Sequence, residues 1–123
     1  SNYLFKREVK ESDMAKVLFL IMSDDSKFEM GLRMAYNSYM KKRYEDVKVA
    51  FFGPSQRRLP KLEGELKEMF QKLLEENVID SACIGVARNE QLIEALTEMG
   101  LRLEPMGDRV AYYVNQGYEV ITF

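Results

Sequence analysis

Continuous apolar runs, separated by turn-forming residues, define the strands that this sequence predicts. Residues 15–22 (AKVLFLIM) and 47–52 (VKVAFF) are mostly apolar and rich in β-branched and aromatic side chains. Such runs are typical of strands that are buried on both faces of a parallel sheet. Residues 78–88 (VIDSACIGVAR) and 118–123 (YEVITF) have a similar character, and residues 101–104 predict a shorter strand. The pattern therefore predicts five strands.

Between these runs the apolar positions recur every three to four residues, which indicates helices. The predicted helices cover residues 27–43, 62–76, 89–99 and 107–116. The apolar face of the first is formed by Phe28, Leu32, Ala35, Tyr36 and Tyr39. The basic residues 41–43 carry a charge suited to its carboxyl end, and Asn77 is a suitable cap for the second helix. Gly100 and Gly117 end the last two.

Strands that alternate with helices of this length predict an α/β fold. We expect a three-layer α/β/α sandwich with a five-stranded, mostly parallel sheet. No internal repeat, low-complexity tract or long linker divides the chain, so residues 14–123 are expected to form one domain. Residues 1–13 are expected to be an N-terminal extension, either native or partly a cloning remnant.

Composition excludes several classes of function. The 123 residues carry a formal charge of −2, which argues against a nucleic-acid binder held by phosphate contacts. No apolar run approaches the roughly 20 residues that span a bilayer, and no signal-like segment is present, so a cytoplasmic protein is expected. Because the chain has no histidine, Ser-His-Asp and Cys-His catalysis and histidine-ligated metals are excluded. No cofactor is expected, and no glycine-rich phosphate motif occurs.

Cys83 is the only cysteine and the strongest candidate nucleophile. A cysteine in an apolar run is often a small buried packing residue. However, ligands of parallel sheets bind at the carboxyl ends of strands, and Gly85 would allow a ligand to approach there. Arg88 and the start of the next helix would favour a thiolate. The residues alone leave both a reactive thiol and a packing residue open.

Other strand-end residues are candidates for substrate binding. With those beside Cys83, the set is Ser23, Asp24, Gly53, Pro54, Ser55, Gly85 and Arg88. Asp24 and Asp25 are equally suited to capping a helix, and they have no partners at a metal-ligand spacing, so no metal site is predicted. The basic residues 56–61 are either a solvated loop or an attractor of an anionic substrate or acidic partner. Met30, Met34 and Met40 are expected in the core or a subunit interface.

Taken in order, these segments resemble the DsrE/DsrF-like family of small sulfur-relay proteins. The resemblance covers nearly all of residues 15–123. It rests on the first strand running into Ser-Asp-Asp, on FFGPSQRRL, on Cys83 followed by IGVAR, and on the ending NQGYEVITF. It implies a five-stranded parallel domain that assembles into homotrimers, homohexamers or mixed-subunit rings. In members with a strand-end cysteine, that cysteine accepts sulfane sulfur as a persulfide, and Cys83 matches this position.

Two functions from different classes follow. The first is a sulfurtransferase-like persulfide carrier that works with separate donor and acceptor proteins. Because no second cysteine exists, sulfur would leave by attack from another molecule's thiol. The alternative is a non-catalytic oligomeric module that binds a small anion or nucleotide, with Cys83 as packing. A thiol oxidoreductase is disfavoured because no CxxC pair occurs.

Overall fold

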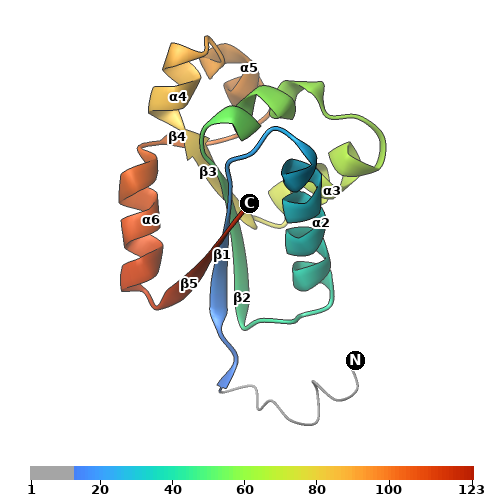
Figure 1. Ribbon diagram of the computed structural model, residues 1–123, viewed down its shortest axis with the longest axis vertical. Helices are drawn as coiled ribbons and strands as arrows, with labels where there is room; N and C mark the ends of the chain where they lie inside the picture. The colour runs from blue at the N-terminus through green and yellow to red at the C-terminus, as the bar shows by residue number, and fades with distance from the viewer. Residues whose placement is uncertain (1–12) are drawn as a thin grey trace.

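The computed structural model of the chain describes residues 13–123, which contain one five-stranded sheet (Figure 1). The strand order is β4-β3-β2-β1-β5, and every neighbouring pair is parallel. The strands are β1 (Lys16–Ile21), β2 (Asp46–Phe51), β3 (Ile79–Cys83), β4 (Leu103–Glu104) and β5 (Tyr118–Thr122). The predicted N-terminal extension lies, apart from Asp13, outside the described residues.

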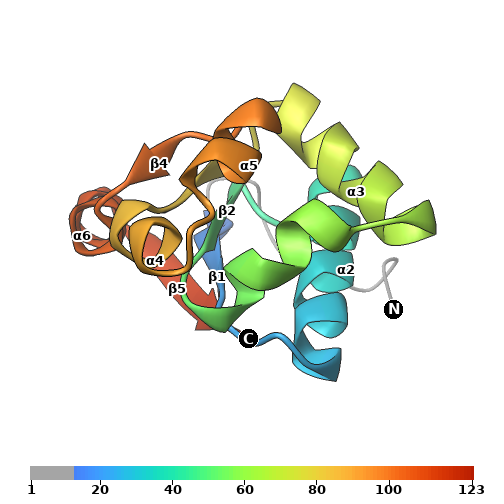
Figure 2. The same cartoon turned by 90° about the horizontal axis from the view of Figure 1, so that it is seen from above.

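The helices that connect these strands differ in length. They are α2 (Ser26–Met40), the 3₁₀-helix η2 (Pro54–Lys61), α3 (Gly64–Glu75), α4 (Ile84–Asn89), α5 (Ile93–Glu98) and α6 (Met106–Asn115). Figures 1 and 2 show α2 and α3 on one side of the sheet and α6 on the other. The predicted three-layer α/β/α sandwich with a parallel sheet is therefore confirmed.

The two faces of the sheet carry unequal cores. Alternate residues of β1 point to opposite faces, as the strand geometry requires. Val17, Phe19 and Ile21 join the large core beneath α2 and α3, which includes Phe28 and Phe70. The second face has a smaller core, formed by Leu18, Leu20, Ala50, Cys83, Met106 and Tyr113. Because β1 is apolar towards both layers, its sequence is a continuous apolar run.

The predicted strands and most predicted helices are confirmed, but the segment after Cys83 is a correction. Residues 78–88 were expected to be a strand-like run that breaks at Gly85, with a helix from 89 to 99. Instead α4 begins at Ile84, and the chain turns at Gln91, which has φ +55°, before α5 begins. The β-branched residues Ile84 and Val86 favour a strand locally, but tertiary packing sets the helix.

Two smaller expectations are also corrected, and one is confirmed. Residues 41–43 lie beyond α2, because the chain reverses at Lys42 with φ +52°. Met30, Met34 and Met40 do not lie in the core, since each is about half exposed, and a place in a subunit interface stays a prediction. Asp25 has the capping role weighed for it, because its side chain accepts the Lys27 amide at 3.0 Å. Among residues 13–123, no helix has the length and apolar content to cross a membrane.

Candidate functional site

The carboxyl ends of β1, β2 and β3 meet at one edge of the sheet, where hydrogen bonds tie the following loops together. The Ser55 amide donates to the carbonyl oxygen of Met22 at 2.8 Å. Gln56 reaches the third strand, because its side-chain amide donates to the Cys83 carbonyl oxygen at 3.0 Å. Its side-chain oxygen accepts the Gly53 amide at 3.0 Å. The candidate segments after β1, β2 and β3 are thus brought together.

Gln56 is a component of this edge that the sequence did not single out. It belongs to the basic segment 56–61, where one alternative was a solvated loop. Its side chain is instead fully buried, and the segment is the 3₁₀-helix η2. A usable signal was the Gly-Pro turn before it, because a buried turn leaves backbone groups that need polar partners.

Cys83 occupies the predicted position at the end of its strand. It is the last residue of β3 and directly precedes α4. The residue is only 8 % exposed, and it lies with Leu20, Ala50 and Met106 in the core between the sheet and α6. Gly85 lies beside the thiol, since a Cβ added there would be 3.9 Å from the Cys83 sulfur. The thiol is therefore at the site but mostly covered.

The other predicted binding residues differ in their exposure and in the structural contacts that already engage them. Ser55 is fully buried and its hydroxyl donates to the Ile21 carbonyl at 2.7 Å, so it has a structural role. Gly53 has φ +98°, a conformation that glycine adopts without strain, and Pro54 is exposed at the start of η2. Ser23 is half-buried at the end of β1.

The two charged candidates lie towards solvent. Asp24 is exposed and pairs with Arg57 at 3.1 Å. Arg88 is exposed in the last turn of α4, and it forms no ion pair with any residue of 13–123. Arg88 is therefore an unneutralised cation five residues beyond Cys83.

The basic segment is partly neutralised by ion pairs. Arg57 also bonds Glu90 at 2.9 Å, and Arg58 pairs with Glu29 at 3.3 Å. The hydrogen bond to Asp24 and the charge of Glu90 raise the pKa of Arg57. These contacts connect η2 to α2 and to the end of α4, so the arginines position the strand-end loops more than they attract an anion.

A second polar cluster, which the sequence did not predict, centres on Asp80. Its carboxylate is 5 % exposed and accepts two hydrogen bonds from Arg109, at 2.9 and 2.7 Å. Tyr113 and Ser81 also donate to it, at 2.7 and 2.8 Å. Burial alone would raise the pKa of Asp80, but these hydrogen bonds outweigh it and lower the pKa to about 2. The signal was an aspartate inside an apolar strand, which requires a buried partner.

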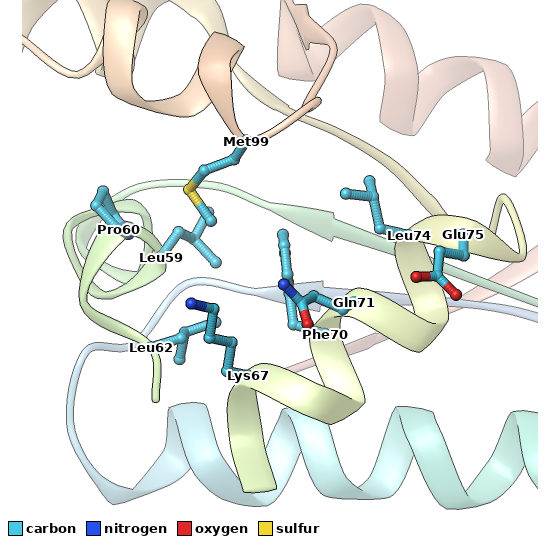
Figure 3. Close-up of a pocket in the computed structure, with 9 residues that line it drawn as sticks. All are labelled: Leu59, Pro60, Leu62, Lys67, Phe70, Gln71, Leu74, Glu75 and Met99. Carbon is cyan, nitrogen blue, oxygen red and sulfur yellow. The ribbon is translucent and has the colours of Figure 1, made fainter. Parts of the chain in front are cut away.

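A groove of about 450 Å³, lined by both apolar and polar side chains, lies between η2, α3 and the end of α5 (Figure 3). Its floor is formed by Leu59, Leu62, Phe70 and Leu74, and the Met99 side chain extends towards Leu59. None of the predicted site residues lines this groove. Among residues 13–123, no group of three or more acidic or cysteine side chains is arranged to hold a metal ion.

The fold and its strand-end edge define a small all-parallel α/β protein with a single cysteine at the end of β3. The chain matches no protein-family model and no curated protein sequence. It is similar to the solved structure of a conserved protein of unknown function from Bacteroides thetaiotaomicron, with a TM-score of 0.74 and 18 % identity. That match covers 94 % of this chain and 100 % of the other. At this identity the likeness extends to the fold alone.

Proposed function

We propose that the protein is a sulfur-relay protein in which Cys83 carries sulfane sulfur as a persulfide. The observation that carries the proposal is the position of the single thiol, at a strand end where loops from three strands meet. Gly85 beside the sulfur supports it further, as does the cation of Arg88, which forms no ion pair with residues 13–123. A cytoplasmic setting, as the sequence leads us to expect, would keep this thiol reduced.

Sulfur transfer needs the Cys83 thiolate, a persulfide donor and an acceptor thiol. The Cys83 thiolate attacks the sulfane sulfur of a persulfide donor, a Cys83–S–S bond forms, and the donor leaves as its thiolate. A thiolate on an acceptor protein then attacks the terminal sulfur, and the Cys83 thiolate is released. Since Cys83 is 8 % exposed, donor access requires α4 or the adjoining loops to move locally.

The burial of Cys83 favours a second function, that of a binding module in which the cysteine only packs against Leu20 and Met106. Native-state alkylation separates the two. For a carrier, we expect iodoacetamide to modify Cys83 in the folded protein within about tenfold of its rate in the unfolded protein. A thiol that reacts only at the rate of global unfolding would contradict the carrier and support the module.

We further propose that the chain forms a homo-oligomer, a trimer or a hexamer. The smaller core on the second face of the sheet is covered by α6 and, through Val86, by α4, and several large apolar side chains are exposed among residues 13–123. They are Met30, Met34, Met40, Phe52, Ile93, Tyr112 and Val114. Exposed apolar side chains of this size favour subunit contacts.

Light scattering of the full chain measures the assembly directly. At micromolar concentration we expect three or six times the mass of one chain, which is 14.4 kDa. The mass of a single chain under the same conditions would contradict the proposed oligomer.

A further inference from the structure

A polar hollow of about 450 Å³ lies at the opposite end of the sheet from Cys83. It is bounded by the amino-terminal ends of β1 and β2, by the first half of β3, and by helix α6. In Figure 1 this end of β1 and β2 is at the bottom, whereas α4, which follows Cys83, is at the top. The hollow is thus separate from the strand-end site.

Its lining is unusual for the layer between a sheet and a helix. On the α6 side of β1, Leu18 and Leu20 are buried core residues, but the next position towards the amino end is Lys16. In β2 the same alternation places Lys48 beyond Ala50. Both lysines are half-buried, so their apolar stems lie along the sheet while their ammonium groups remain accessible.

These two lysines have no anionic partner among residues 13–123. Lys16 donates to the backbone carbonyl of Gln116 at 2.7 Å, and Lys48 donates to that of Asn77 at 2.8 Å. Neither ammonium lies within 4.0 Å of a carboxylate of residues 13–123. Because an ammonium has three N–H donors, each retains donors for a ligand.

The acidic groups nearby are already engaged. Asp80 is saturated by Arg109, Tyr113 and Ser81. Asp46, beside the hollow, accepts the hydroxyl hydrogen of Tyr118. The burial of Tyr118 and this bond raise its pKa, so it remains a neutral donor.

Arg102 adds a third cation with weak internal contacts. Its side chain is 56 % exposed, and its only ion pairs within residues 13–123 are long, at 3.6 Å to Asp80 and 3.6 Å to Glu104. The hollow is therefore lined by four cations, Lys16, Lys48, Arg102 and Arg109, and one carboxylate, that of Asp80. Of these four cations, only Arg109 forms a close ion pair with a carboxylate of residues 13–123.

We propose that this hollow binds the phosphate group of a small metabolite. A phosphate carries close to two negative charges and several acceptor oxygens, which suits two ammonium groups and a guanidinium fork. The volume of the hollow is in the range of small-ligand sites. Exposed Tyr112 at its rim offers an aromatic surface for the organic part of a phosphate ester.

Amide NMR titration of the full chain tests the proposal, with inorganic phosphate and phenyl phosphate as the two probes. We expect both to shift the amides of residues 16, 48, 77 and 102, and phenyl phosphate also to shift Tyr112. In the double variant Lys16→Gln/Lys48→Gln the dissociation constant should rise at least about tenfold, because charge-assisted hydrogen bonds are lost. Succinate and chloride at matched ionic strength should produce much smaller shifts.

Two further variants keep the test decisive. Arg102→Gln alters a mostly exposed side chain, so it should fold normally and still weaken phosphate binding severalfold. Lys67→Gln, in the groove of Figure 3, should leave binding unchanged. No site-specific shift up to about 10 mM phosphate, equal shifts with succinate, or unaltered binding in Arg102→Gln and the double variant would overturn the proposal.

Discussion

Replacement of Asp80 by alanine is expected to lower the free energy of unfolding by about 3–5 kcal/mol. The change removes the carboxylate that pairs with Arg109 of α6 through two hydrogen bonds. The Arg109 side chain, which is 23 % exposed, is then left without an anionic partner at that position. The change also leaves the buried Tyr113 hydroxyl without its acceptor. Removal of one member of a buried charged network is costly because the other members remain desolvated.

Chemical denaturation followed by circular dichroism measures this loss, and Asp24→Ala is the matched control. Asp24 also pairs with an arginine, Arg57, but both side chains are nearly half exposed. An exposed pair contributes at most about 1 kcal/mol. A loss for Asp80→Ala no larger than that for Asp24→Ala would show that the Asp80 network does not stabilise the fold.

The same network gives the protein a characteristic acid response. The pKa of Asp80 is lowered from 3.8 to about 2, so the folded state holds this carboxylate more firmly ionised than the unfolded state. Its contribution, about 2 kcal/mol, is complete above pH 4 and is lost as the pH falls from 4 towards 2. Asp80→Ala should flatten the profile of stability against pH in this window, as measured by denaturation at a series of pH values.

The fold could be predicted because local pattern and tertiary structure agree along most of the chain. The apolar run of β1 faces a core on each side, and the helical stripe of α2 from Phe28 to Ala35 faces the larger one. The predicted secondary structure of the segment from Ile84 to Leu92 was wrong. Its β-branched residues favour a strand, whereas tertiary packing makes the segment a helix followed by a turn. For Met30 and Met34 only the core alternative is wrong, because apolar character does not determine which face of a helix is buried within the chain, and the subunit interface stays a prediction.

The candidate site was only partly predictable. Parallel strands place their carboxyl ends together, so the sequence could bring Cys83 near Ser23 and Gly53. The Gly-Pro turn signals a need for polar partners near Gln56, but no local pattern reveals that its partner is the carbonyl of Cys83, 27 residues along the chain. The Asp80 network likewise depends on how α6 returns across the sheet, since Arg109 is 29 residues distant. Polar contacts between residues far apart in the sequence are therefore the part of the site that could not be predicted.

The second large expected effect is the complete loss of sulfur loading in Cys83→Ser. Cys83 is the only cysteine, so no other side chain can form a persulfide. With thiosulfate as donor, the thiolate attacks the sulfane sulfur, the sulfur–sulfur bond of thiosulfate breaks, and sulfite leaves. Serine at this position preserves size but is not a comparable nucleophile towards sulfur, so the variant should fold and remain unmodified.

Intact mass measurement of the native chain after incubation with thiosulfate, polysulfide or a persulfidated protein tests the sulfur-carrier proposal most directly. We expect the wild-type protein to gain the mass of one sulfur atom, to lose it to an added thiol, and Cys83→Ser to gain nothing. A native wild-type protein that acquires no sulfur from any of these donors would contradict the proposal and leave Cys83 as a packing residue.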